Sequence, residues 1–190
     1  MGIHQSHAQI GDKLVPHMGF MYQMVVLQDT FASASEANIF YYAFNLGTYY
    51  TLAHLNDVAS VGVDGSVNFG FNFVNTFNGT RINIFTQVPV WLMGRVGANS
   101  TSFNQQKIGL GAGIGGHYTF YSEKFNQQKA GFINPAAMAE ATILSRSGTL
   151  TVRGHMALSR TESALKSTVS GTEINRLRFG TWGIGLIYGF

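Results

Sequence analysis

Residues 61–73 read VGVDGSVNFGFNF, and this stretch decides the fold class. From Val61 to Phe73 every second residue is valine or phenylalanine, with a glycine at position 65 as the one interruption. The residues between them are glycine, aspartate, serine and asparagine. Successive side chains of a β-strand point to opposite faces, so this pattern gives one apolar face and one small, polar face. A helix, with its period of 3.6 residues, does not produce it.

The same alternation recurs along the chain, and turn-rich breaks separate the alternating segments. We predict eight strands, at 17–28, 38–53, 58–74, 81–97, 106–122, 132–145, 149–162 and 175–190. These segments exceed the about 9–11 residues that a tilted strand needs to cross a bilayer. The breaks after the first, third, fifth and seventh strands are longer than most of the others, which is typical of outer-membrane barrels.

The composition excludes two simple classes of protein. Charged residues make up 11% of the chain, whereas a soluble domain carries about 25%. No run approaches the ~18 consecutive apolar residues of a membrane helix. A soluble lipocalin-like barrel would carry its charges outside, but here they fall at strand ends, in turns or on the glycine-bearing face. We therefore predict an all-β fold, an eight-stranded antiparallel up-and-down transmembrane β-barrel over residues 16–190, after a polar periplasmic tail at 1–15.

The last predicted strand ends in an unbroken apolar row. Residues 178–190 read RFGTWGIGLIYGF. One face of this strand carries Trp182, Ile184, Leu186, Tyr188 and Phe190. The row resembles the C-terminal signal of bacterial outer-membrane proteins, which the barrel-assembly machinery recognises. The resemblance implies a bacterial outer membrane, its lipid and that machinery as partners, and an even number of strands would place both termini in the periplasm.

A second resemblance covers residues 81–122. The stretch IFTQVPVWLMGRVG at 84–97 is followed by KIGLGAGIGG at 107–116. This order of a PxxxxxRxG strand and a glycine-rich strand is similar to the outer membrane protein beta-barrel domain common in Bacteroidetes. The resemblance implies a fold and a compartment, but no activity and no cofactor.

Aromatic residues suggest where the membrane interfaces lie, because Tyr and Trp rings suit a boundary that is apolar on one side and wet on the other. We expect the outer interface at Phe40, Tyr42, Phe71, Phe73, Tyr118 and Phe120. We expect the inner interface at Tyr50, Tyr188 and Phe190. The alternative is general β-propensity, since aromatic residues favour any strand.

The interior of an eight-stranded barrel is just wide enough for side chains to fill. Glycines line the inner face of segments 106–122 and 175–190, and they leave room for bulky inward residues of neighbouring strands, namely Phe85, Trp91, Met93 and Tyr121. We therefore expect a plugged lumen. The alternative is a water-filled crevice between the glycines.

Alternation also predicts which charges face inward: Asp64, Arg81, Arg95, Lys107, His117, Glu140, Arg153 and His155. Buried charges are costly unless they pair, so we expect an ion network. A tight turn around Ser147 and Gly148 sets Glu140 nearly opposite His155, with Arg153 two residues away on the same face. The expected cluster is Glu140–Arg153/His155, with a structural role preferred over a proton-linked or catalytic one.

Little in the sequence indicates catalysis. Ser159, His155 and Glu140 are the available hydrolase set, but Ser159 and His155 are four strand positions apart, roughly 13 Å. No Gly-x-Ser-x-Gly elbow is present. His4, His7 and His17 could bind a metal, but we expect neither metal nor cofactor. The basic residues are too scattered for a nucleic-acid partner.

Three functions remain open. The first is a structural or accessory barrel that docks onto a larger outer-membrane assembly, which the short loops and the lack of site chemistry favour. The second is a small passive porin or ligand-binding barrel. The third, and least favoured, is an outer-membrane lipid or peptide hydrolase.

Overall fold

The computed structural model describes residues 14–29, 36–76, 79–100, 106–123 and 127–190. All its regular elements are strands: β1 Leu14–Asp29, β2 Glu36–Asn56, β3 Ala59–Thr76, β4 Gly79–Gly97, β5 Ile108–Glu123, β6 Gln128–Ser145, β7 Gly148–Ala157, β8 Thr161–Ser167 and β9 Glu173–Gly189. Leu14 and Val15, which we had assigned to the tail, belong to β1. No helix in the described part of the chain is long and apolar enough to cross a membrane.

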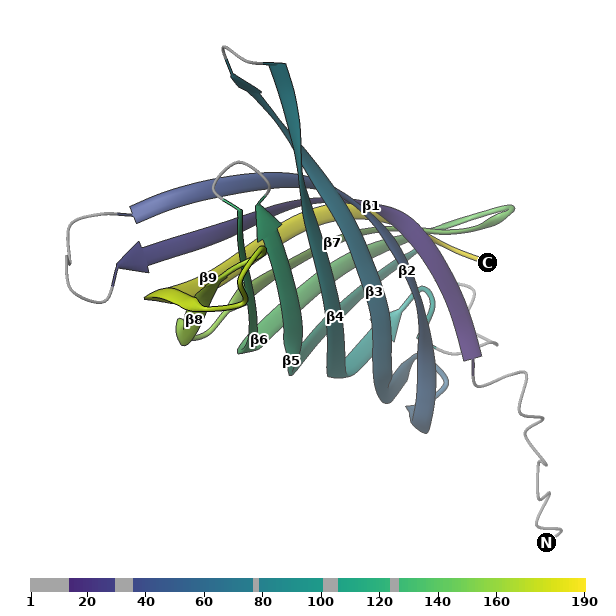
Figure 1. The fold of residues 1–190 in the computed structure, drawn as a ribbon. Coiled ribbons are helices and arrows are strands. Elements are labelled where there is room, and N and C mark those ends of the chain that lie inside the picture. Colours follow the sequence, from purple (N-terminus) through teal and green to yellow (C-terminus); the bar gives the residue numbers. More distant parts are fainter. Residues whose placement is uncertain (1–13, 30–35, 77–78, 101–105, 124–126) are drawn as a thin grey trace, which may run out of the picture.

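The strands form one antiparallel sheet that closes on itself (Figure 1). Each of β1 to β6 pairs with the next strand in the chain, and β7 pairs with β9. Pairing of β1 with β9, from His17 opposite Gly189 to Asp29 opposite Leu177, completes the ring. The predicted up-and-down antiparallel β-barrel is confirmed. The start of β1 and the end of β9 meet at one rim, here called the terminal rim, and the opposite one is called the loop rim.

The predicted single strand at 149–162 is wrong, because β7 ends at Ala157 and β8 begins at Thr161. Both lie between β6 and β9, so nine strands occupy eight positions in the ring. At the interruption the Asn134 side chain of β6 donates to the carbonyl oxygens of Ser159 and Phe179, each at 3.0 Å. A side chain thus replaces part of the main-chain ladder.

The predicted contrast between short and long connections holds only in part. At the terminal rim, residues 57–58 join β2 to β3 and residues 146–147 join β6 to β7. The β4–β5 connection at the same rim spans 98–107, which is longer than the β1–β2 connection at the loop rim. At the loop rim the strands themselves are extended, and the β3–β4 hairpin projects beyond its neighbours (Figure 1).

Alternation sorts the side chains into two unlike faces. The outer face is apolar, and Phe20, Ile114 and Ile133 are 72%, 65% and 64% exposed. The inner face, among the described residues, buries more polar and charged side chains than hydrophobic ones. The bulky residues that we expected inside are buried: Phe85, Trp91, Met93 and Tyr121.

Glycines make this interior possible. A Cβ at Gly113 of β5 would lie 2.7 Å from the Cβ of Met93, and a Cβ at Gly111 would lie 2.8 Å from Cγ of Glu140. Real Cβ atoms do not approach other atoms so closely. The thin wall at β5 therefore admits the large side chains of the adjacent strands.

Candidate functional site

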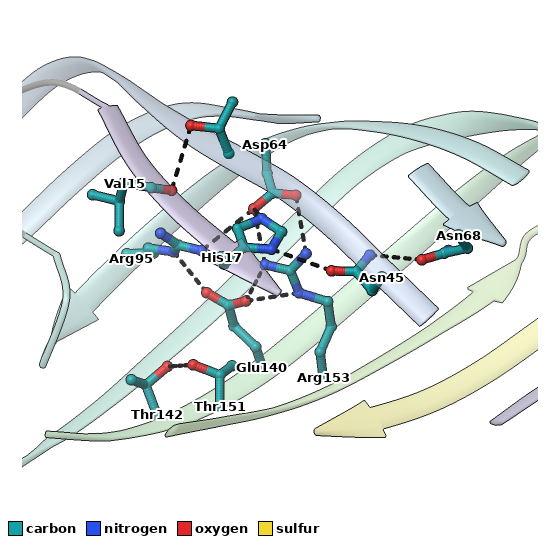
Figure 2. A network of polar contacts seen from close by, with 11 residues as sticks. Val15, His17, Asn45, Asp64, Asn68, Arg95, Glu140, Thr142, Thr151 and Arg153 are labelled. Carbon is teal, nitrogen blue, oxygen red and sulfur yellow. Dashed lines mark hydrogen bonds and ion pairs between the residues drawn. The ribbon is translucent and has the colours of Figure 1, made fainter. Parts of the chain in front are cut away.

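Five side chains from five strands meet inside the barrel near the terminal rim (Figure 2). They are His17 of β1, Asp64 of β3, Arg95 of β4, Glu140 of β6 and Arg153 of β7, and we call them the ion network. Each lies at an inward position of its strand and is at most 6% exposed. The network therefore ties together strands that are far apart in the sequence.

Arg153 holds the two carboxylates of the network (Figure 2). Its Nη1 and Nη2 donate to Oδ1 and Oδ2 of Asp64, both at 2.9 Å. Its Nη2 and Nε also donate to Oε2 of Glu140, at 2.8 and 3.0 Å. Forked, charge-assisted bonds of this kind are among the strongest hydrogen bonds in proteins, and they fix geometry as well as charge.

Arg95 completes the charge balance. Its Nε donates to Oε1 of Glu140 at 2.6 Å, and its Nη2 lies 3.5 Å from Oδ2 of Asp64. Its guanidinium also lies 3.8 Å from the ring centre of Tyr49, which is a cation–π contact. Two guanidiniums thus face two carboxylates, so the network can be buried without a net charge from these four groups.

A row of uncharged polar residues continues from the network around the wall. The two ring nitrogens of His17 lie 3.1 Å from Oδ2 of Asp64 and 3.2 Å from Oδ1 of Asn45. Side-chain hydrogen bonds then link four strands in succession through Asn45, Asn68, Gln87 and Thr119. Sequence reasoning missed this row, although its members share the inward face of their strands.

Glu140 lies opposite Arg153 and not, as we expected, opposite His155, which faces Met138. The turn is made by Arg146 and Ser147, so Ser145 pairs with Gly148 and the register shifts by two residues. A shift of two keeps every side chain on the same face. The predicted inward direction of Glu140, Arg153 and His155 is therefore confirmed, whereas the predicted pairing of Glu140 with His155 is wrong.

Three other expected members lie outside the network. Lys107 precedes β5 and is exposed, so it does not join the buried network. His117 and His155 are buried in a separate cluster with Trp91, where the three ring centroids are 5.7–6.3 Å apart. Nε2 of His117 lies 2.5 Å from Oγ1 of Thr181. The side chain of Arg81 lies outside the described residues.

Side chains fill the barrel at two levels. Toward the loop rim lies an aromatic layer, which we define as Tyr41, Phe85, Tyr121, Phe132 and Phe179, each at most 3% exposed. Toward the terminal rim lies the ion network, beside a cavity of about 10 Å³ lined in part by His17, Arg95 and Arg153. That volume is room for about one water molecule. The described interior is therefore packed at both levels.

The residues of the hydrolase set are not assembled into a triad. Glu140 is bonded to two arginines, His155 packs against Trp91 and His117, and Ser159 is exposed between β7 and β8. His4 and His7 lie outside the described residues. Within the described ranges no group of three or more His, Asp or Glu side chains could hold a metal ion.

The residues predicted for the membrane interfaces lie on the outer face. Phe40, Tyr42, Tyr50, Phe71, Phe73 and Tyr118 are 38–65% exposed, and Phe120 is half-buried. In the C-terminal row Ile184, Leu186 and Phe190 are exposed, while Trp182 and Tyr188 are half-buried. The side chains of both sets can therefore contact the medium around the barrel.

No protein-family model matches the chain, and no curated protein matches it. The resemblance of residues 81–122 to the Bacteroidetes domain therefore stays a prediction. Among solved structures, the chain is similar to Ail, the attachment invasion locus protein of Yersinia pestis, in two crystal structures. One is a complex with the heparin analogue sucrose octasulfate, with 15% identity and a TM-score of 0.45, and the other has 14% identity and a TM-score of 0.48. Both likenesses cover 94% of this chain and 99% of Ail.

Neisserial surface protein A (NspA) is also similar to the chain. The identity is 9% and the TM-score is 0.44, over 92% of this chain and 97% of NspA. Likenesses with identities and TM-scores this low assign no function to the chain.

Proposed function

We propose that this chain is an integral β-barrel of a bacterial outer membrane with a closed lumen, and that it acts as a structural or accessory subunit of a membrane assembly. The observation that carries the proposal is the reversed distribution of polarity. Large apolar side chains cover the outside of the ring, while charges and amides are buried inside it. Lipid outside the barrel is the environment that such a distribution fits.

The outer surface supports membrane insertion. A soluble monomer rarely exposes contiguous apolar patches beyond a few hundred Å². Here the exposed apolar residues follow the outward positions of the strands all around the ring. The sheet closes by the pairing of β1 with β9, so the described strands leave no long open edge, as a spanning sheet requires. The tight turns at residues 57–58 and 146–147 favour a periplasmic terminal rim.

The packed interior favours a role for the outer surface over transport or catalysis. A passive porin needs an aqueous path, but the aromatic layer and the ion network fill this lumen at two levels. The hydrolase set is dispersed. Other molecules can therefore reach only the outer wall and the rims of the described barrel. This is expected of a barrel that docks against a partner.

Membrane insertion is tested by refolding the chain into detergent and into lipid vesicles. We expect a band on unboiled gels that shifts on heating, β-rich circular dichroism, and protection from protease in vesicles. A monomer that stays soluble and folded without detergent would overturn the proposed location.

The accessory role is tested by site-specific photo-cross-linking in native outer membranes. A cross-linker at outward Ile114 should capture a neighbouring membrane protein, whereas one at inward Thr119 on the same strand should not. Capture of lipid alone, at Ile114 and at further outward positions around the ring, would overturn the accessory role and leave the barrel itself intact.

A further inference from the structure

Two lysines face each other near the loop rim, on the outer side of the wall. Lys129 of β6 is the direct pairing partner of Lys166 of β8. Both residues occupy outward positions, since their neighbours Ala130 and Leu165 are buried in the interior. Directly opposite side chains in a sheet have Cβ atoms about 4.5–5.5 Å apart, and like charges at that spacing destabilise the pair.

Among the described residues, one acidic residue pairs directly with either lysine. Across β5 the partner of Lys129 is Ser122, and across β9 the partner of Lys166 is Glu173. Glu173 is already engaged, because its Oε1 accepts from Nε of Arg176 at 2.8 Å. Within the described residues neither lysine forms an ion pair.

Below the lysines, toward the middle of the barrel, the wall is hollowed. A pocket of about 350 Å³ is lined by both lysines and by Tyr118, Phe120, Gly131 and Ala164. Phe120 pairs with Gly131, two positions deeper than Lys129. Two cations thus lie at the edge of the pocket, and two aromatic rings line it on the side toward the middle of the barrel.

We propose that this pocket binds an anionic lipid of the outer leaflet, with its phosphate between Lys129 and Lys166 and an acyl chain over Phe120 and Tyr118. The inference rests on the proposed membrane location. A bridging phosphate offsets the repulsion between the ammonium groups. The hollow beside Tyr118, whose hydroxyl group covers Gly131, accepts the chain. The pocket thus combines complementary charge for the head group with an apolar surface for the tail.

The test is a titration of the folded full-length chain, in zwitterionic detergent, with diphosphoryl lipid A and with phosphatidylcholine. The variant Lys129→Gln/Lys166→Gln should bind lipid A more weakly by about fivefold for each lysine, because a lysine near an anionic surface contributes about 1 kcal/mol. The matched control, Lys107→Gln/Arg146→Gln, loses the same charge at the terminal rim and should bind like the wild type.

A second measurement separates binding from folding. Without lipid, the double lysine variant should unfold at the same temperature as the wild type or higher, because the repulsion between the lysines is gone. Three results would each overturn the site. The control variant could lose as much lipid A binding as the double lysine variant does. The wild type could bind phosphatidylcholine, or inorganic phosphate alone, as tightly as it binds lipid A. If the chain inserts into phosphatidylcholine vesicles but does not bind lipid A, the lipid site is overturned and the membrane location stands. If the chain does not insert, the proposed membrane location is overturned.

Discussion

At the residue scale, Arg153 is the side chain on which the ion network depends most. It donates to both Asp64 and Glu140, so Arg153→Met leaves one guanidinium for two buried carboxylates. Breaking a buried pair in this way costs about 3–5 kcal/mol. We expect the free energy of unfolding of the detergent-folded barrel, measured by urea titration, to fall by that amount.

Arg153→Met is compared with the double variant Asp64→Asn/Arg153→Met in a double-mutant cycle. The double variant leaves Arg95 and Glu140 as a neutral pair. It should recover part of the stability that the single variant loses, because no excess negative charge remains. A double variant that is less stable than Arg153→Met by the full cost of Asp64→Asn would show that the two side chains act independently.

The glycine-rich wall gives a second prediction at this scale. In Gly113→Ala the new methyl group would meet the Cβ of Met93 and the carbonyl oxygen of Leu92, at 2.7 and 2.9 Å. Overpacking of this kind costs about 1–3 kcal/mol. The matched control is Gly94→Ala on the adjacent strand, where the nearest atom would be 3.9 Å away. Equal urea midpoints for the two variants would contradict the role of glycine in admitting Met93.

At the element scale, the interruption between β7 and β8 depends on Asn134. Its Nδ2 serves the carbonyl oxygens of Ser159 and Phe179, and it also lies 3.0 Å from Oγ1 of Thr161. In Asn134→Leu these acceptors, of which the carbonyl oxygen of Phe179 is buried, lose their donor, at a cost of about 1–3 kcal/mol. We expect faster amide hydrogen exchange in β8 and the adjoining half of β9, with the β2–β5 wall unchanged.

Asn175→Ala is the control for this prediction. Asn175 lies in the same hairpin, but within the described residues its Oδ1 accepts only from the neighbouring backbone N–H of Arg176. Hydrogen exchange measured by mass spectrometry should therefore barely change in this variant. Uniform acceleration around the whole ring in Asn134→Leu would show that β8 does not open as a separate unit.

The same elements show what alternation can and cannot predict. Period-two patterning predicted the outer and inner faces of β3, β5 and β9, because a strand in a barrel wall must sort its side chains. The same patterning wrongly extended the seventh strand to residue 162. At the break, residues 158–160, a side chain of another strand, Asn134, takes part of the hydrogen bonding, and alternation does not reveal this. The patterning also placed Lys107 in the inner network, although this residue precedes β5 and is exposed.

Partners inside the barrel were harder to predict than directions. Asp64 and Arg153 are 89 positions apart in the chain. They meet only because the ring closes and sets the tilt of each strand. The local sequence pattern predicts whether each residue points inward. Which residues meet across the lumen depends on the register of every strand that lies between them in the ring. The β6–β7 turn alone moved the partner of Glu140 by two residues.

At the scale of the whole molecule, the two filled levels act in series against the passage of ions. The ring of Tyr41 stacks on Phe85 with centroids 5.1 Å apart, and Tyr121 meets Tyr41 edge-on at 6.5 Å. The ion network lies beyond this layer, nearer the terminal rim. Opening one level therefore leaves the other in place.

We accordingly expect no unitary current from the wild type in planar bilayers, nor from Tyr41→Ala/Phe85→Ala, because the ion network still fills the lumen. Current should appear only when two further parts of the filling are also removed without changing the net charge. These are the network, by Asp64→Ser, Arg95→Ser, Glu140→Ser and Arg153→Ser, and the buried cluster with His117 and His155, by Trp91→Ser. Heat-shifted gel bands from the same vesicles verify that each protein is folded and inserted. Stepwise conductance of the wild type would contradict the closed lumen, and conductance of the aromatic variant alone would show that the network does not seal it.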